Sequence, residues 1–369
     1  MLQINNFSLK TKYLLISSFY ELEVRHGGVK RADQVVELFK EFDIVMTNPY
    51  FSIKKAIKFA FYSPIEVVES FIFSIYLFFR GLSCKGLILF SFKLVEVIKV
   101  IKAYKEREII LEGGGNLPIL VMNYLIFKNL KYNTFLQNIE YLVPEKNLKN
   151  YFKSPKDKYF LELNGYKNAN SIYTIGYLDS AILGCHKVQS ETINYYPSGK
   201  DYKKLERIRT YRNKKNIKNN SGFILLLGSV SNPPTKQGML DAIKFFQSQK
   251  NKYQVKVAGF GTNMFNHLKS SNIDILGSVT EEKLKKLMQN AKCLIVNQVQ
   301  TTGFLIKIVD FNLAGIPIFL TSDYYQGLNL EKYGIFRVDY SKIYKILNSK
   351  IIDSKFSTFD KPKLKYQKN

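Results

Sequence analysis

Residues 300–323 read QTTGFLIKIVDFNLAGIPIFLTSD, the most informative stretch of this chain. A Thr-Thr-Gly turn leads into an apolar helical pattern that stops at Ala-Gly, after which Ile-Pro-Ile-Phe-Leu-Thr continues as a strand. Lys307 and Asp310 are three residues apart in the helical pattern, which places both on one face of a helix. A helix start with unpaired N–H groups beside a cation suits a phosphate-bearing ligand.

The same alternation of strand and helix extends through the second half of the chain. Strand patterns occur at GFILLLGSV, YQVKVAGFG, NIDILGSV, CLIVNQ and GIFRVDY, and helical patterns such as EEKLKKLMQNA separate them. Alternation of this kind builds a doubly wound parallel sheet, with ligands at the carboxyl ends of the strands. We therefore expect a Rossmann-like C-terminal domain at residues 221–350.

The first half of the chain begins with the same alternation of strand and helix patterns. YLLISSF reads as a strand, Gly27-Gly28 as a turn, VKRADQVVELFKEF as a helix and DIVMTNP as the next strand. Later strand patterns are REIILEG, NTFLQNIEYL and ANSIYTIG. These segments predict an α/β class and a second Rossmann-like domain at residues 1–200.

An apolar insertion at residues 51–104 interrupts the alternation of strands and helices. It carries FIFSIYLFF and GLILFSF, and Arg80 and Lys85 divide it into runs well short of the roughly 18 to 20 residues that span a bilayer. Two interpretations remain: helices that lie at a membrane surface, and helices packed on the domain with basic outer faces.

Two polar segments complete the domain prediction. Residues 201–220 are strongly basic, and a solvated linker between the domains explains them better than a dedicated binding patch. Residues 351–369 form a polar tail that either packs back or is disordered.

Length, cysteine content and net charge indicate the number of domains, the cellular compartment and the kind of partner. A length of 369 residues favours two domains, and three scattered cysteines favour a reducing, cytoplasmic compartment without a disulfide framework. The net charge of +25 comes mainly from lysine. It suits an anionic membrane surface, whereas no zinc spacing or RNA-binding signature indicates specific nucleic-acid binding.

Glycine turns in both halves predict an anion site in a cleft between the two domains. Neither half carries a G-x-G-x-x-G fingerprint or a Walker loop, which argues against dehydrogenases and P-loop enzymes. A nucleoside diphosphate suits such a cleft. The glycines concerned are Gly27, Gly28, Gly228, Gly259, Gly261 and Gly303.

With these pieces in order, the chain resembles the GT-B glycosyltransferases, in particular the retaining family four that includes bacterial surface-polysaccharide transferases. Further pieces of the resemblance are QNIEY, NANSIYTIGYLD, LLLGSVSNPP and VAGFG. The most specific is Gly-x-x-x-Lys-x-x-acid followed by Ala-Gly-x-Pro. It is matched one by one by Gly303, Lys307, Asp310, Ala314, Gly315 and Pro317.

The resemblance implies a nucleotide sugar held by the C-terminal domain and an acceptor held by the N-terminal domain. It places Asp310 at the donor ribose. The family's earlier acidic residue falls at Thr302, so Gln300, Thr301, Thr302 or backbone N–H groups are the substitutes for donor contact. Relatives often have histidine where Gln137 stands, so the imidazole's role is unassigned in this chain.

Departure of a nucleoside diphosphate needs stabilisation of negative charge, which cations and backbone amides supply. Lys307 is the first catalytic candidate and Lys236 the second. Glu140 is the third, either as a carboxylate near the acceptor or as a structural hydrogen-bonding group. No Asp-x-Asp motif and only three histidines are present, so we expect no metal.

Residues beside the first glycine turn are candidates for the acceptor side. They are Arg25 and His26, to which we add Asn138 in the QNIEY segment. Lys30 and Arg31 are further cations that could approach a phosphate from this side. For each cation the alternative is an ordinary exposed side chain.

We therefore expect a cytoplasmic transferase, peripheral on the inner face of the cell membrane. It moves a sugar from a UDP- or GDP-sugar, without a cofactor, to a lipid-linked or oligosaccharide acceptor of a surface glycan such as capsule, lipopolysaccharide or exopolysaccharide. The alternative is a non-catalytic GT-B scaffold that recruits a partner enzyme to the membrane.

Overall fold

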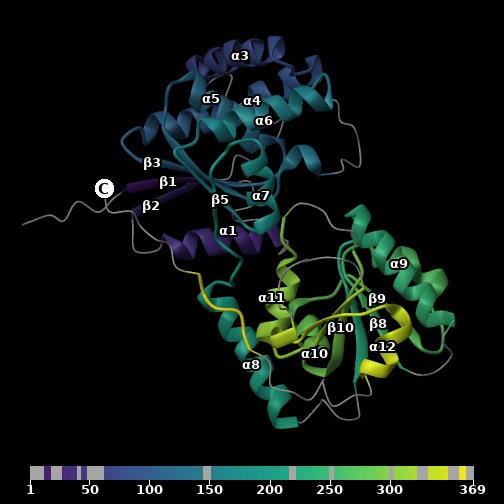
Figure 1. Cartoon of the computed structure of the whole chain (residues 1–369). Helices are drawn as coiled ribbons and strands as arrows, with labels where there is room; N and C mark the ends of the chain where they lie inside the picture. The colour runs from purple at the N-terminus through teal and green to yellow at the C-terminus, as the bar shows by residue number, and fades with distance from the viewer. Residues whose placement is uncertain are drawn as a thin grey trace, which may run out of the picture. The chain divides into compact units, whose positions relative to one another are not determined.

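A computed structural model of the chain is shown in Figure 1. It describes residues 12–17, 27–39, 43–47, 62–143, 151–215, 222–248, 253–298, 303–321, 331–347 and 357–362. These residues form two compact units. The first contains the described residues up to Tyr195 together with Gly303, Phe304 and Pro362, and the second contains those from Tyr196 to Gln298 and from Leu305 to Lys361.

The first unit is built on a six-stranded parallel sheet with the order β2-β1-β3-β4-β5-β6. Its strands are β1 (Lys12–Ser17), β2 (Asp43–Thr47), β3 (Glu108–Gly113), β4 (Tyr132–Leu136), β5 (Ser171–Thr174) and β6 (Glu191–Thr192). Its helices are α1 (Gly27–Leu38), α3 (Pro64–Phe79), α4 (Cys84–Ala103), α5 (Asn116–Phe127), α6 (Pro155–Lys167) and α7 (Tyr177–Cys185), with the 3-10 turn η1 (Glu140–Leu142).

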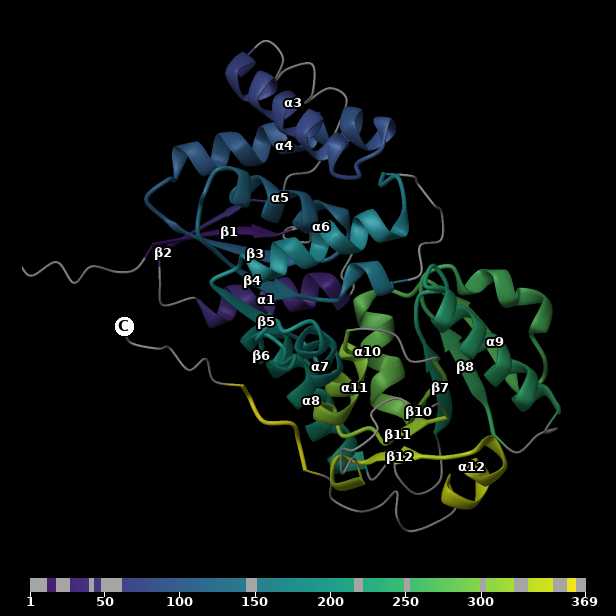
Figure 2. The ribbon, with the colours of Figure 1, turned by 45° about the horizontal axis from the view of Figure 1, so that its top comes forward.

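Alternating side chains give this sheet two apolar faces. On β1, Leu14 and Ile16 join the core formed with α4 and α5, whereas Tyr13 and Leu15 join the core formed with Val35 of α1. Successive residues of a strand point to opposite faces, so the unbroken run YLLI serves both cores. Figures 1 and 2 show the result, with α1 on one face of the sheet and α5 and α6 on the other.

The apolar insertion is helical where it is described, as α3 and α4. Phe73 and Leu77 of α3 are fully buried in the larger core of the first unit. In both views α3 is the outermost layer of that unit, stacked on α4 (Figure 2). Among the helices that the structure describes, none combines the length and the apolarity needed to cross a bilayer.

The second unit contains the other parallel sheet, with the order β12-β11-β10-β7-β8-β9. Its strands are β7 (Phe223–Leu227), β8 (Val255–Ala258), β9 (Ile273–Gly277), β10 (Ala291–Val296), β11 (Ile318–Leu320) and β12 (Ile335–Arg337). Its helices are α8 (Gly199–Lys215), α9 (Pro233–Ser248), α10 (Glu281–Asn290), α11 (Ile306–Leu313) and α12 (Tyr340–Leu347), with the 3-10 turns η2 (Thr262–Leu268) and η3 (Glu331–Tyr333).

Each strand order reverses once, and ligands of doubly wound sheets bind beside that reversal at the carboxyl ends of the strands. In the first unit the reversal lies between β1 and β3, and in the second it lies between β7 and β10. Both sheets therefore have the predicted doubly wound architecture. The reversals mark where a site is to be sought in each unit.

The basic segment at residues 201–220 is not a solvated linker where it is described. Residues up to Lys215 form α8, which belongs to the second unit. Buried Arg212 donates to the carbonyl oxygens of Met288 (3.0 Å), Ala291 (2.6 Å) and Gly315 (3.2 Å). Charge density alone predicted solvent exposure, but α8 buries Leu205, Ile208 and Arg212 against this unit.

The described part of the tail packs back on the second unit. Asn312 of α11 donates to the carbonyl oxygen of Ser357 (2.9 Å) and accepts from the backbone N–H of Phe359 (3.0 Å). The Phe359 ring also stacks on that of Tyr333, with the ring centres 4.4 Å apart. Of the two alternatives for the tail, packing therefore applies to residues 357–359.

Candidate functional site

In the second unit, two glycine turns meet at the carboxyl ends of β7 and β8. The N–H of Gly228 donates to the carbonyl oxygen of Ala258 (3.1 Å), and Gly259 follows with a φ of +132°. A Cβ atom on Gly259 would lie 1.9 Å from the carbonyl oxygen of Gly228. Only glycine allows so close an approach, so these predicted donor-side glycines do lie together.

Lys307 of α11 reaches the same place. Its Nζ donates to the carbonyl oxygen of Leu227, the last residue of β7, at 3.1 Å. A Cβ atom on Gly228 would lie 3.7 Å from that Nζ. Burial lowers the pKa of Lys307 to about 8, so the ammonium is poorly solvated where β7 ends. The sequence placed Lys307 beside the Gly303 turn, whereas the structure places its Nζ at the glycine turn that follows β7.

The other candidate residues of the second unit differ in how far they are buried. Asp310 is buried in α11, one turn after Lys307, with 5% of its surface exposed. Gly261 begins η2 at a φ of +77°, and a Cβ there would come 2.6 Å from a Val230 methyl group. Lys236 lies exposed in the first turn of α9. The ribose contact of Asp310 and the catalytic role of Lys236 remain predictions.

A polar contact missed by the sequence analysis fixes α9 beside this turn. Thr235 donates from its Oγ1 to the Oε1 of buried Gln298, at 2.9 Å. Gln298 follows β10 and Thr235 follows β7, so their bond spans the reversal of strand order. Thr235 lies within α9 rather than directly after β7, so no local pattern in the sequence indicated this contact.

In the first unit, a buried carboxylate occupies the reversal of strand order. Glu112 on β3 accepts from the Ser17 hydroxyl on β1 (2.5 Å) and from the Gln137 amide (2.5 Å). Gln137 also donates to the carbonyl oxygen of Gly28 (3.0 Å). Burial raises the pKa of Glu112 to about 7, against the opposing effect of these hydrogen bonds and of Arg31. No motif in the sequence singled out Glu112.

Two predictions beside this carboxylate need correction. Gly27 and Gly28 are the first two residues of α1 rather than a turn ahead of it. Arg31 is fully buried, and it donates to the Gln34 side chain (2.5 Å) and the Ile193 carbonyl (2.9 Å). Burial lowers the pKa of Arg31 to about 10. It is therefore neither an exposed side chain nor a cation presented to solvent.

Glu140 lies beyond the ends of β3 and β4. Its Oε1 accepts from the Asn138 amide (3.4 Å), and a Cβ on Gly114 would lie 2.7 Å from that oxygen. Its backbone N–H donates to Glu162 (2.7 Å), and its carbonyl accepts from Lys158 (2.8 Å). Glu140 is thus held by backbone bonds while its carboxylate lies beside Asn138.

Gly303 groups with these residues of the first unit rather than with Lys307. Its N–H donates to both carboxylate oxygens of Asp179 (3.1 Å each), and its φ is +86°. A Cβ on Gly303 would lie 2.1 Å from the Asn138 side-chain oxygen. The N–H expected to be free for phosphate is therefore engaged by a carboxylate. Burial raises the pKa of Asp179 to about 6.

Five candidates lie outside the described residues: Arg25, His26, Gln300, Thr301 and Thr302. Their predicted acceptor-side and donor-side roles remain predictions. Of the described candidates, Gly228, Gly259 and Lys307 lie together in the second unit, and Asn138, Glu140 and Gly303 lie together in the first, beside Gln137.

Comparisons with known proteins find the same fold among solved structures. No family model matches the sequence, and no curated protein matches it. A glycosyltransferase from Rickettsia africae is 14% identical with a TM-score of 0.56, covering 93% of this chain and 90% of that one. HepE from Anabaena, solved with UDP, is 12% identical with a TM-score of 0.55 and the same coverage.

An epimerase shares the architecture with these transferases. UDP-GlcNAc 2-epimerase from Methanocaldococcus jannaschii is 10% identical with a TM-score of 0.52, covering 92% of this chain and 93% of that one. At such identities a likeness of structure establishes the fold and not the reaction. The two doubly wound parallel sheets, and a likeness that spans nearly the whole chain, show that this protein has the GT-B fold.

Proposed function

We propose that this protein is a glycosyltransferase that uses a nucleotide sugar as donor. The observation that carries the proposal is the Lys307 ammonium at the glycine turn of β7, with its Nζ 3.1 Å from the Leu227 carbonyl. Sugar transfer leaves a nucleoside diphosphate, whose negative charge a poorly solvated ammonium and backbone amides stabilise. The similarity to HepE, solved with UDP, favours a UDP-sugar over a GDP-sugar.

The finer features follow the resemblance in sequence. The acceptor is a lipid-linked or oligosaccharide precursor of a surface glycan, and transfer retains configuration without a metal. We place the enzyme on the inner face of the cell membrane, where such acceptors are exposed to nucleotide sugars. In the first unit, the Asn138 and Glu140 side chains, 3.4 Å apart, are our candidates for contact with the acceptor.

A panel of UDP, UDP-sugars and GDP-sugars tests the donor assignment by thermal stabilisation and by slow release of free sugar. We expect a UDP compound to stabilise the wild-type protein and the Lys307→Met variant to lose that stabilisation. Lys244→Met is the matched control, because Lys244 is exposed on α9. Stabilisation that survives in Lys307→Met would refute the role of Lys307, and no response to any nucleotide would favour the non-catalytic scaffold.

Nucleotide-sugar epimerisation is the second candidate, favoured by buried carboxylates with raised pKa values in the first unit. Glu112 has a pKa raised to about 7 and Asp179 one raised to about 6, both by burial. Carboxyl groups titrating near neutrality are suited to proton transfer. Proton NMR of the incubated UDP-sugar separates the two reactions, because an epimerase yields a new UDP-sugar whereas a transferase yields UDP.

A further inference from the structure

Helix α3 has an exposed apolar face in addition to the buried one that carries Phe73 and Leu77. Six of its side chains form an exposed row, which we call the apolar stripe: Ile65, Val68, Phe71, Ile72, Ile75 and Phe79. Their exposed fractions run from 38% at Ile75 to 80% at Phe79. The spacing of three and four residues keeps the row on one face along the whole helix. A helix on the surface of a water-soluble domain normally shows the opposite arrangement.

The polar side chains of α3 point into the protein instead. Ser70 and Ser74 are fully buried, and the Ser70 hydroxyl donates to the Ser91 carbonyl of α4 at 2.5 Å. The inner face of α3 packs through Phe73 and Leu77 together with these serines, so the outward apolar stripe is not used in packing α3 on the first unit. Two serines are thus buried while six apolar side chains of the same helix stay exposed to water.

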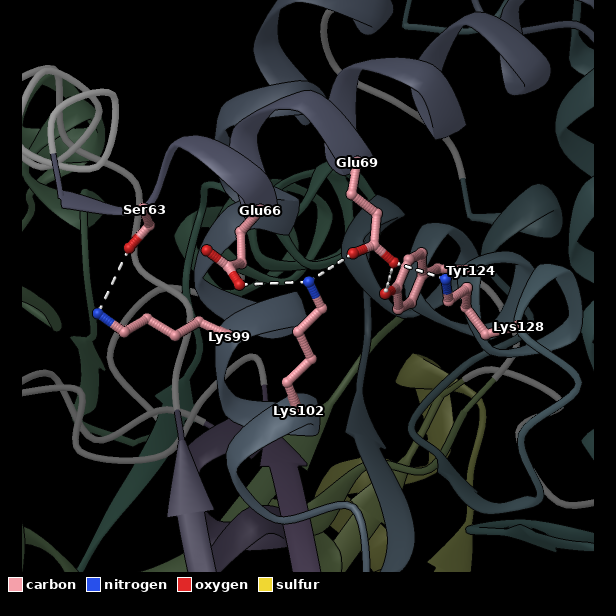
Figure 3. Close-up of polar contacts among 7 residues, drawn as sticks. All are labelled: Ser63, Glu66, Glu69, Lys99, Lys102, Tyr124 and Lys128. Atoms are coloured by element: carbon pink, nitrogen blue, oxygen red, sulfur yellow. Dashed lines mark hydrogen bonds and ion pairs between the residues drawn. The ribbon is translucent and has the colours of Figure 1, made fainter.

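The carboxylates of α3 are neutralised on that inner side, as Figure 3 shows. Glu69 pairs with Lys102 (2.7 Å) and Lys128 (2.8 Å), and it accepts from the Tyr124 hydroxyl (2.8 Å). Glu66 pairs with the same Lys102 at 3.2 Å. Lys99 adds a bond to Ser63, just ahead of the helix, at 3.4 Å. This network fixes the rotation of α3, so the apolar stripe is held outward rather than free to turn inward.

A groove between α3 and α4 continues the apolar stripe. It has a volume of about 480 Å³, and Val68, Phe71 and Ile72 of α3 face Ile88 and Phe92 of α4 across it. Ile88 is itself 62% exposed. Stripe and groove together form one apolar surface to which two helices contribute.

The charge around this surface has a single sign. Between Tyr62 and Ala103, all of which are described, the exposed charged side chains are Arg80, Lys85, Lys99 and Lys102. Lys102 is paired with Glu66 and Glu69, so Arg80, Lys85 and Lys99 form what we call the cationic rim. The carboxylates in that range, Glu66, Glu69 and Glu96, are partly buried. An apolar surface with a cationic rim complements a bilayer that carries anionic headgroups.

We propose that α3 and α4 dock this protein on an anionic lipid bilayer, with the apolar stripe among the acyl chains and the cationic rim at the headgroups. The groove then receives lipid hydrocarbon. A second copy of the chain is the less suitable occupant, because a two-fold contact through this surface would bring the two cationic rims together. The proposal does not depend on sugar transfer and concerns only the first unit.

Co-sedimentation of the full chain with vesicles tests the proposal. We compare phosphatidylcholine vesicles with phosphatidylcholine–phosphatidylglycerol vesicles and expect binding to the mixed vesicles that weakens with salt. The variant Ile65→Ser/Ile72→Ser/Phe79→Ser should bind about tenfold more weakly or worse, because three exposed apolar side chains no longer enter lipid. The control Phe260→Ser/Met264→Ser removes exposed apolar side chains of the second unit and should bind like the wild type.

A second variant separates charge from apolar contact. Arg80→Gln/Lys85→Gln should lower affinity for the mixed vesicles and leave the weak binding to neutral vesicles unchanged. Equal binding by the triple variant and the wild type would overturn the proposal. A second result would also overturn it: no binding of the wild type to either kind of vesicle, together with wild-type dimers in sedimentation velocity that the triple variant does not form. The apolar surface would then join two copies of the chain.

Discussion

The Ser17 hydroxyl on β1 donates a 2.5 Å hydrogen bond to the buried Glu112 carboxylate on β3, across the reversal of strand order in the first unit. Gln137 donates to the other oxygen of the same carboxylate. Gln137, where the resemblance led us to expect histidine, therefore binds a carboxylate. The carboxyl ends of this sheet hold a titratable group whose pKa, about 7, lies near neutrality.

Glu112 should make the stability of the protein depend on pH. Its pKa is raised from 4.5 to about 7 in the folded state, so the folded state binds the proton more tightly than the unfolded state. Stability is therefore highest below the unfolded value and falls as pH rises through both values. We expect Glu112→Gln to flatten this decline when urea unfolding is followed between about pH 5 and about pH 8.

The variant Glu162→Gln is the informative comparison. Burial raises the pKa of Glu162 to about 7 as well, but its carboxylate accepts different hydrogen bonds. Both Glu162 oxygens accept from backbone N–H groups, those of Glu140 and Tyr141 at 2.7 Å. An amide nitrogen at that position would face an N–H donor, so the free energy of unfolding of this variant should be lower by about 1–3 kcal/mol at every pH. Glu112→Gln keeps its bonds, since the Ser17 hydroxyl can turn to accept. Equal losses in the two variants would contradict this account.

Gly303→Ala should destabilise the first unit. Its φ is +86°, and the added Cβ would meet the Asn138 side-chain oxygen at 2.1 Å and the Gln137 carbonyl at 2.7 Å. The left-handed backbone alone costs about 1–2 kcal/mol, and the contacts add to it. Gly184→Ala is the control, because Gly184 lies in α7 with no atom within 4 Å of a new Cβ. Thermal unfolding should show a lower midpoint for Gly303→Ala and an unchanged or higher one for the control.

Much of this fold was predictable from the sequence because each strand is a short apolar run bounded by glycine or polar residues. GFILLLGSV became β7 and REIILEG became β3, each close to its predicted bounds. The glycine turn at Gly228 was predictable for the same reason, since it follows a strand of the sheet. The sequence placed Lys307 beside Gly303 instead, so its approach to Gly228 was not predicted. Parallel strands bring their carboxyl ends to one edge.

The polar contacts within the first unit were not predictable. Ser17 and Glu112 are 95 residues apart, and their bond depends on a strand order that leaves no periodic signal in the sequence.

The basic segment of α8 was wrongly predicted to be solvated for a related reason. Its charged residues conceal three buried positions one turn apart: Leu205, Ile208 and Arg212. The engagement of Gly303 by Asp179 depends on residues 124 positions apart.

Arg212 gives a direct test of the corrected role of α8. Its guanidinium donates to carbonyl oxygens of Met288, Ala291 and Gly315, and Arg212→Met would leave these buried acceptors without their donor. We expect a loss of about 2–5 kcal/mol, because several buried acceptors lose a charged partner at once. Arg207→Met removes an exposed arginine of the same helix and should change stability by no more than about 0.5 kcal/mol. Similar effects in both variants would restore the linker interpretation.

Lys307 should give nucleotide binding and stability opposite dependences on pH. Burial lowers its pKa from 10.5 to about 8, so the ammonium that would attract a diphosphate is lost as pH rises through 8. The phosphates of UDP are already ionised above about pH 7, so its affinity should fall between about pH 7 and about pH 9. Stability without nucleotide should rise from pH 8 to 10.5, because there the unfolded state binds more protons than the folded state.

Lys307→Met removes the titrating group and should flatten both dependences. Its affinity for UDP at about pH 7 should be about 10- to 100-fold below that of the wild type, the range expected for a lost charged hydrogen bond. Isothermal titration at several pH values measures the first dependence, and urea unfolding measures the second. Lys244→Met should keep the wild-type profile in both. If the UDP affinity of the wild type stays level across this range, the ammonium of Lys307 does not contact the diphosphate.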